Sequence, residues 1–155
     1  MMKLQQFMKI SVVVSAIFLT SSQVMAAGDY SAAPAKSTVV AAANKSISKG
    51  DFAAAYKTLS TGVKKDAKNA DIHNLLGYSA RKLGNYDASE SHYTTALKLD
   101  PKHKGALEYM GELYLTLNKP DEAEKLLARL DDICWLGCDV KDTLAAAIAD
   151  WKAKQ

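Results

Sequence analysis

ADIHNLLGYSARKLGNYDASESHYTTALKLDPKH, residues 70–103, contains two apolar runs separated by a short polar turn and closed by a proline. The landmark residues of these runs lie at the offsets of a 34-residue helix-turn-helix repeat. Glycine favours the left-handed turn between two helices, and proline cannot continue the second one. The segment therefore predicts a helix-turn-helix unit. Its landmarks are Leu76-Gly77, Gly84-Asn85-Tyr86, Tyr93, Ala96 and Asp100-Pro101.

The same pattern recurs, without a gap, on both sides of this segment. Shifting the frame by 34 residues gives units 36–69, 70–103 and 104–137. At these offsets the chain resembles the tetratricopeptide repeat (TPR) family. The resemblance implies an all-α fold, with three helix-turn-helix units in a short right-handed superhelix. The equivalent residues are Gly77 with Gly111, Gly84 with Gly50, Tyr86 with Phe52, and Tyr93 with Leu59 and Leu127.

The three units match the family pattern to different degrees. In the first, helices are expected near 37–49 and 52–64, and Gly62 stands where the pattern has alanine. A glycine inside a helix costs about 1 kcal/mol relative to alanine, so we expect this unit to be the least stable. In the third unit, Asn118 takes the left-handed position and Pro120 starts the next helix.

Residues 138–155 predict one further helix that caps the stack. Asp139 is the expected N-cap, and a repeat array needs such a helix because its last unit otherwise exposes an apolar face. The alternative is a helix that docks on a membrane or a partner. The apolar stripe consists of Val140, Leu144, Ile148 and Trp151.

Residues 1–26 have the pattern of a secretory signal peptide. Lys3 and Lys9 precede an apolar stretch at 10–19, and small residues follow at Ala26-Ala27. The apolar stretch falls short of the roughly 20 residues that span a bilayer, so cleavage after Ala26 or Ala27 is expected. Residues 27–35 form a short linker. We expect export across the cytoplasmic membrane, in a Gram-negative bacterium to the periplasm, and no membrane insertion after the signal is removed.

Composition excludes several classes of function. Removing Lys3 and Lys9 with the signal lowers the formal net charge from +3 to +1, which is no charge balance for nucleic-acid binding. His73, His92 and His103 are widely spaced and predict structural roles rather than a metal site. The sequence has no nucleophile elbow, phosphate loop or haem motif, so neither an enzyme nor a cofactor is expected. Oligomeric state cannot be read from the sequence.

Cys134 and Cys138 are the two cysteines of the chain, and an exported protein favours a disulfide between them. A continuous helix would hold the two thiols awkwardly. We therefore expect Gly137 to end the helix and let Cys138 fold back. Free thiols, metal binding and redox chemistry remain as alternatives.

The resemblance also implies a binding groove on the first helix of each unit. Asparagine side chains there can hold a peptide backbone, Tyr78 offers an apolar ring, and Arg81 a charge. The alternative is that Arg81 pairs with Glu112 and the groove is simply solvated. The candidate groove residues are Asn44, Asn74, Tyr78, Arg81, Lys82, Glu108, Glu112 and Leu115.

The function predicted from these features is an exported adaptor that binds a protein or an extended peptide segment. Family members that clamp the carboxyl end of chaperone tails use lysine and arginine at positions where this chain has Val40, Gly105 and Tyr109. Chaperone-tail binding is therefore disfavoured. Two alternatives remain, a redox or metal-handling protein that uses the cysteine pair, and a self-assembling structural unit.

Overall fold

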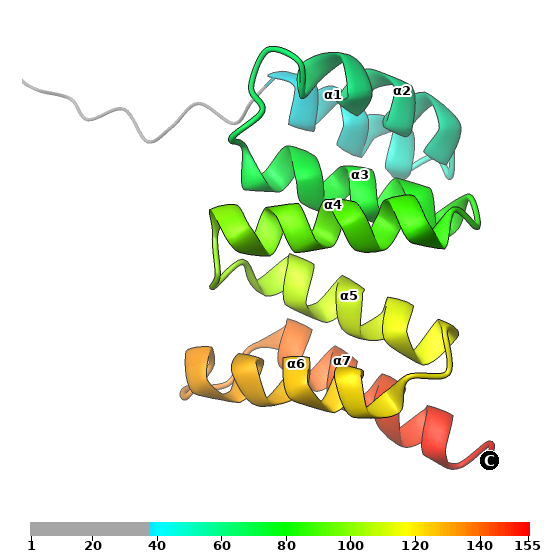
Figure 1. Ribbon diagram of the computed structural model, residues 1–155, viewed down its shortest axis with the longest axis vertical. Coiled ribbons are helices and arrows are strands. Elements are labelled where there is room, and N and C mark those ends of the chain that lie inside the picture. The colour runs from blue at the N-terminus through cyan, green and yellow to red at the C-terminus, as the bar shows by residue number, and fades with distance from the viewer. Residues whose placement is uncertain (1–37) are drawn as a thin grey trace, which may run out of the picture. The chain divides into compact units, whose positions relative to one another are not determined.

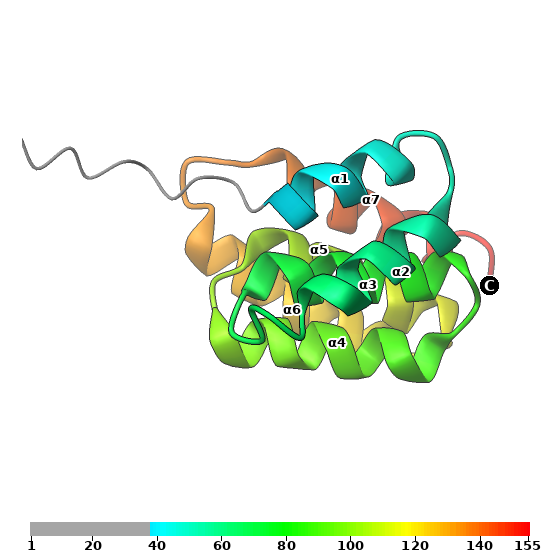
Figure 2. The same cartoon turned by 90° about the horizontal axis from the view of Figure 1, so that it is seen from above.

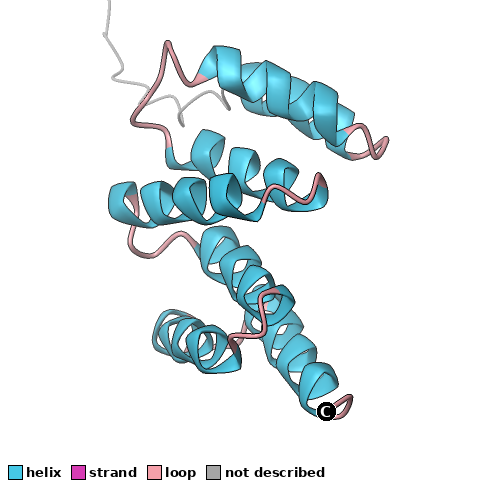
Figure 3. Ribbon diagram, turned by 45° about the vertical axis from the view of Figure 1, so that its right-hand side comes forward, coloured by secondary structure: helices cyan, strands magenta, loops and turns pink. Residues whose placement is uncertain are grey.

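The computed structural model describes residues 38–155. The predicted signal peptide, the linker and the start of the first unit lie outside these residues. The described part of the chain consists of helices joined by short loops, with no strand (Figure 3). The helices are α1 (Thr38–Ile47), α2 (Phe52–Gly62), α3 (Ala70–Lys82), α4 (Tyr86–Leu99), α5 (Lys104–Thr116), α6 (Pro120–Ile133) and α7 (Asp139–Lys152).

The helices stack in chain order as three antiparallel pairs followed by α7. Their connecting loops alternate between the two ends of the stack (Figure 1). Seen from above, α1 and α7 project to the same side of α3 and α5, while α4 and α6 lie on the other side (Figure 2). The helices α1, α3, α5 and α7 therefore form an inner layer with a concave face. This confirms the all-α fold of repeated helix pairs.

The turns have the backbone geometry that the sequence predicted. Gly50, Gly84, Asn118 and Gly137 have φ angles of 75°, 78°, 59° and 89°, in the left-handed region. Pro120 is the first residue of α6, where its missing N–H costs no hydrogen bond. These positions end one helix and allow the next to reverse direction.

Small residues allow the two helices of a pair to approach closely. A Cβ atom placed on Gly77 of α3 would lie 2.7 Å from the ring of Tyr93 in α4. One turn away, Ser89 donates a hydrogen bond of 2.8 Å to the carbonyl of Gly77. Tyr93 and Ala96 are fully buried in the same contact. The landmarks of the quoted segment are thus the residues at which α3 and α4 touch.

Helix α7 packs as the predicted cap. Leu144 and Ile148 are buried, and Val140 and Trp151 pack against the same core. The N-cap was predicted at Asp139 but lies one residue earlier. Cys138, which has extended backbone, is the N-cap, and Asp139 is the first residue of the helix. None of the described helices is both long enough and apolar enough to cross a bilayer.

Gly62 does not have the role expected from sequence. It is the last residue of α2 and is buried, and a Cβ atom there would lie 2.3 Å from Cγ1 of Val39 in α1. The collision of an alanine side chain with α1 would therefore outweigh the stabilisation expected from its higher helix propensity. The glycine permits a close contact between helices, and the expectation that it merely weakens α2 is wrong.

We predict that Gly62→Ala lowers the free energy of unfolding by about 1 to 3 kcal/mol, the usual cost of overpacking. Thermal and urea melts of the mature chain measure this. In a Val39→Ala background the same substitution should lose most of its penalty, because the colliding methyl groups are gone. A stabilising effect of Gly62→Ala in the parent would contradict the close packing of α1 on α2.

Candidate functional site

The eight candidate groove residues lie on three consecutive helices of the inner layer. Asn44 is on α1, Asn74 to Lys82 are on α3, and Glu108 to Leu115 are on α5. The repeat places them there because equivalent positions of successive first helices face the same side. Between the inner-layer helices α1, α3, α5 and α7 the concave face has two hollows, separated by a contact between α3 and α5.

The first hollow lies between α1 and α3 and has a volume of ≈ 230 Å³. Asn74 is its most constrained residue, since its side chain is 7% exposed and its Oδ1 has no hydrogen-bond partner within residues 38–155. A buried carbonyl without a partner is uncommon and costs free energy until a donor satisfies it. The walls of this hollow are Val40, Asn44, Asp71, Asn74 and Leu75.

Gly105 of α5 makes room for the Asn74 amide. A Cβ atom at Gly105 would lie 3.3 Å from Nδ2 of Asn74, closer than ordinary van der Waals contact. The glycine therefore lets α5 approach α3 without displacing the asparagine.

The second hollow lies between α5 and α7 and has a volume of ≈ 340 Å³. Trp151 belongs both to the core stripe of α7 and to this surface. Its partly buried ring offers a broad apolar surface beside Leu115. The lining residues are Leu115, Thr116, Ala147, Asp150, Trp151 and Lys154.

Between the two hollows, four residues of α3 and α5 form a contact that we call the central bridge: Tyr78, Arg81, Tyr109 and Glu112. The Tyr78 and Tyr109 rings have centroids 4.8 Å apart, and the Arg81 guanidinium donates a hydrogen bond to the Glu112 carboxylate. The sequence left open whether Arg81 would pair with Glu112, and in the structure it does. Lys82 lies beside the bridge, with its ammonium 5.4 Å from the centre of the Tyr78 ring.

Glu108 lies on α5 next to the central bridge and is only 7% exposed. Burial, and to a lesser extent repulsion from Glu112, raise the pKa of its carboxyl from 4.5 to about 7, while Arg81 opposes the rise. Burial likewise raises the pKa of the neighbouring Tyr109 hydroxyl. Glu108 therefore exchanges a proton near neutral pH, which gives the concave face a charge that depends on pH.

Two residues of this face were not among the predicted groove residues. Tyr109 was considered only as a departure from the chaperone-tail pattern, although an aromatic residue at this repeat position lies opposite Tyr78 of the preceding unit. His103 is the N-cap of α5: its Nδ1 accepts a hydrogen bond from the backbone N–H of Ala106, and its Nε2 lies 3.0 Å from Oδ1 of Asp71. A histidine just before a helix is the signal that could have indicated this cap.

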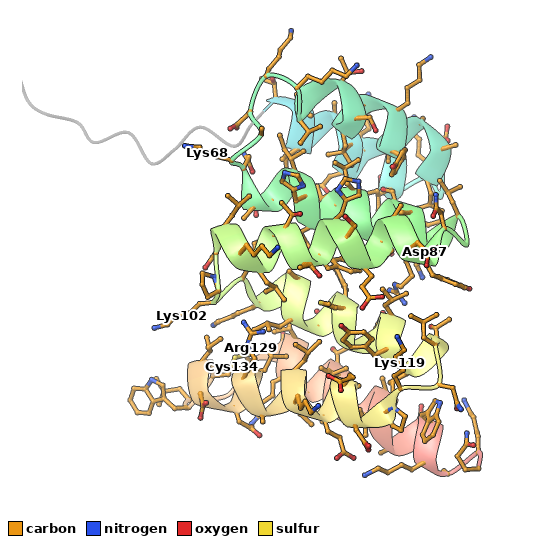
Figure 4. All side chains as sticks on the ribbon, in the orientation of Figure 1. Lys68, Asp87, Lys102, Lys119, Arg129 and Cys134 are labelled. Atoms are coloured by element: carbon orange, nitrogen blue, oxygen red, sulfur yellow. A yellow bond between two sulfur atoms is a disulfide. The ribbon has the colours of Figure 1, made fainter. Side chains whose placement is uncertain are left out.

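The cysteine pair lies away from the groove, in the loop between α6 and α7. Figure 4 places Cys134 at the opposite end of α6 from Lys119. The Sγ atoms of Cys134 and Cys138 are 2.03 Å apart, and Gly137 turns the chain back between the helices as expected. Trp135 and Leu136 at the tip of this loop are 81% and 80% exposed.

We predict that the titration of Glu108 lowers the stability of the parent protein as the pH rises from about 4.5 to about 7. In this window the Glu108 carboxyl, whose pKa is about 7 in the folded chain against an ordinary value of 4.5, binds more protons in the folded state than in the unfolded state. Ionisation at higher pH therefore penalises folding. Glu108→Gln should remove this penalty and flatten the profile, measured as melting temperature against pH.

Asp132→Asn provides the control for a general change in charge, because Asp132 is exposed near the end of α6. Its pH profile should follow that of the parent through the window. A Glu108→Gln profile that also follows the parent would show that Glu108 is not the group responsible.

Comparisons with known proteins agree with this architecture. Two family models, each described as tetratricopeptide repeat, match residues 40–89 and 80–133, so that together they span 40–133. Among curated proteins, none matches the chain.

Solved structures share the fold at low sequence identity. The first TPR of Spaghetti (RPAP3) bound to the HSP90 peptide SRMEEVD has a TM-score of 0.65 and 20% identity, over 75% of this chain and 91% of that one. The Yersinia enterocolitica type III secretion chaperone SycD, in complex with a peptide of the translocator YopD, has a TM-score of 0.66 and 18% identity, over 76% and 92%. A tetratricopeptide repeat protein from Parabacteroides merdae has a TM-score of 0.63 and 18% identity, over 75% and 45%.

The repeat spacing, the stacked helix pairs and the two overlapping family matches lead to one assignment: the chain belongs to the tetratricopeptide repeat family.

Proposed function

We propose that this protein is an adaptor that binds an extended polypeptide segment on the concave face of α1, α3, α5 and α7. The observation that carries the proposal is the buried, unpartnered Oδ1 of Asn74 in a hollow with apolar walls. A peptide N–H is the donor that such an acceptor lacks. The family is typically a protein-interaction module, and two of the structural neighbours were solved with bound peptides.

The first hollow supplies the elements of peptide recognition. Asn74 would bind a main-chain N–H, and Asn44, which is exposed on α1, could bind a second main-chain group across the hollow. Val40 and Leu75 provide apolar walls for one side chain of the peptide. Main-chain hydrogen bonds would provide affinity and the apolar wall selectivity, as in other modes of peptide recognition.

The central bridge limits what the rest of the face can recognise. Arg81 is already paired with Glu112, so breaking that pair to bind a carboxylate would leave Glu112 without its partner. Tyr78 is held between Tyr109 and Phe52, with ring centroids 4.8 and 5.9 Å away, and presents a fixed surface. We infer that the bound segment crosses the bridge by apolar contact and does not depend on a free cation there.

This surface favours a ligand different from the chaperone tails bound by some neighbours. Val40, Gly105 and Tyr109 stand where members that clamp a terminal carboxylate have lysine or arginine. The ligand proposed here is an internal or extended segment, recognised through its backbone and one or two apolar side chains.

We further propose that the adaptor acts outside the cytosol, as a mature chain that begins at Ala27 or Gly28. The support is the charge and apolar pattern of residues 1–26 together with the proximity of Cys134 and Cys138, which is compatible with a disulfide in an oxidising compartment. In this proposal the disulfide fixes the turn between α6 and α7.

We expect Asn74→Ala and Tyr78→Ala to weaken peptide binding by about 1 to 2 kcal/mol each, because both remove contacts at the centre of the face. The ligands are peptides selected with the mature chain from a random library, and affinities are measured by isothermal titration calorimetry. Melting temperatures of both variants establish that they remain folded.

Matched controls are available on α4. Tyr86→Ala removes a tyrosine at the start of α4, and Ser91→Ala a small polar residue exposed on the same helix. Both should bind as the parent does. If the control variants lose affinity while the α3 variants keep it, the concave face is not the binding site.

Export is tested by the intact mass of the protein purified from its native cells. We expect a chain cleaved after Ala26 or Ala27 whose mass is 2 Da below that of the reduced form, from loss of two hydrogens when Cys134 and Cys138 join. Alkylation without reductant should label neither cysteine. A full-length product with two reactive thiols would contradict both the export and the disulfide.

A further inference from the structure

His73 and His92 are 19 residues apart in sequence but adjacent in the fold. Their Nδ1 atoms face each other across the contact between α3 and α4, with a separation of 3.4 Å. Both side chains are only partly buried, so the pair remains accessible to solvent. The pair lies between the two helices of the second unit and is unrelated to the peptide proposal.

The repeat itself shows that imidazoles are not required here for packing. Shifting the frame by one unit places His73 on Leu107 and His92 on Leu126, and both leucines are buried in the core. Two leucines therefore serve the same helix pair in the third unit. The histidines of the second unit replace these leucines with two imidazole rings.

The geometry of the pair is that of a long hydrogen bond or of two ligands of one metal ion. Donor to acceptor distances for N–H groups are usually about 2.7–3.2 Å, and the two Nδ1 atoms are farther apart than that. Two imidazole nitrogens on one tetrahedral metal ion, with bonds of about 2.0–2.1 Å, are separated by about 3.3–3.4 Å. The observed 3.4 Å is also the separation expected for the second arrangement.

The surroundings of His73 keep its facing nitrogen available as a ligand. His73 Nε2 lies 3.0 Å from the carbonyl oxygen of Ala67. Because a carbonyl can only accept, Nε2 carries the proton and the neutral ring has its lone pair on Nδ1. Hydrogen bonding of the second ring nitrogen to a carbonyl is how proteins orient metal-binding histidines. Burial, and then the neighbouring His73, lower the pKa of His92, which favours its neutral form.

We propose that His73 and His92 form a binding site for one divalent transition-metal ion, held by the two Nδ1 atoms. Groups of three or more potential ligands are absent from residues 38–155, so water or an external ligand would complete the coordination. Imidazole suits copper, nickel and zinc, and Cu²⁺ should bind most tightly in the general affinity order of these metals.

The test is a titration of the mature chain, purified without an affinity tag, with Cu²⁺ and separately with Zn²⁺. The binding is followed by calorimetry. We expect one equivalent to bind, with nitrogen couplings from two imidazoles in the Cu²⁺ electron paramagnetic resonance spectrum. His73→Leu and His92→Leu should each weaken binding about 100-fold or more, because loss of an outer-shell partner alone costs about 10- to 100-fold.

Leucine is the matched replacement, because Leu107 and Leu126 occupy the same positions in the next unit, and melting curves check that the variants fold. His103→Ala is the control for a histidine outside the pair and should bind the metal as the parent does. Binding equal in the parent and the His73→Leu, His92→Leu double variant would overturn the proposal. Loss of metal binding in the His103→Ala variant, with binding retained in the two leucine variants, would also overturn the proposal.

Discussion

The close contact between α3 and α4 at Gly77 is the constraint on which the second unit depends. A methyl group at this position would lie 2.7 Å from the Tyr93 ring, so only glycine permits the observed distance between the helices. The contact also fixes the rotation of α3 about its axis, since Gly77 must face α4. Asn74 and Arg81, about one turn before and after it, lie on the same side of α3, and both reach α5, Asn74 beside Gly105 and Arg81 at Glu112. The orientation of α3 thus determines both which of its residues pack in the core and which contribute to the concave face.

The concave face combines two hollows with a rigid centre. The central bridge joins α3 to α5 through an aromatic pair and an ion pair, and it separates the hollow on the α1 side from the hollow beside α7. Such a division suits an extended segment whose ends are bound differently, with main-chain hydrogen bonds at Asn74 and apolar contact at Trp151. Because Glu108 lies buried beside the bridge with its pKa raised to about 7, the charge of this centre changes with pH. The unpartnered amide of Asn74 and the partly neutral Glu108 both lower stability, as polar groups at binding sites often do.

Local signals explain which parts of the structure could be predicted from sequence. Gly84, Asn118 and Pro120 determine backbone geometry at their own positions, so the helix boundaries followed from them directly. The apolar stripe of α7 was likewise visible from spacing within one helix. Contacts between residues that are far apart in the sequence leave no such local signal. Gly62 seemed a defect in α2 because its neighbour Val39 belongs to another helix. The facing nitrogens of His73 and His92 were not predicted for the same reason. Whether Arg81 pairs with Glu112 could be decided only from the structure.

The central claim, that the concave face is the binding surface, is tested most directly by nuclear magnetic resonance of the ¹⁵N-labelled mature chain with a peptide selected from a random library. The account predicts that the amide signals that shift on titration belong to α1, α3, α5 and α7, with the Asn74 side-chain amide among the largest changes. Signals of α4 and α6 should change little. Shifts concentrated on α4 and α6, with the Asn74 amide unmoved, would contradict it.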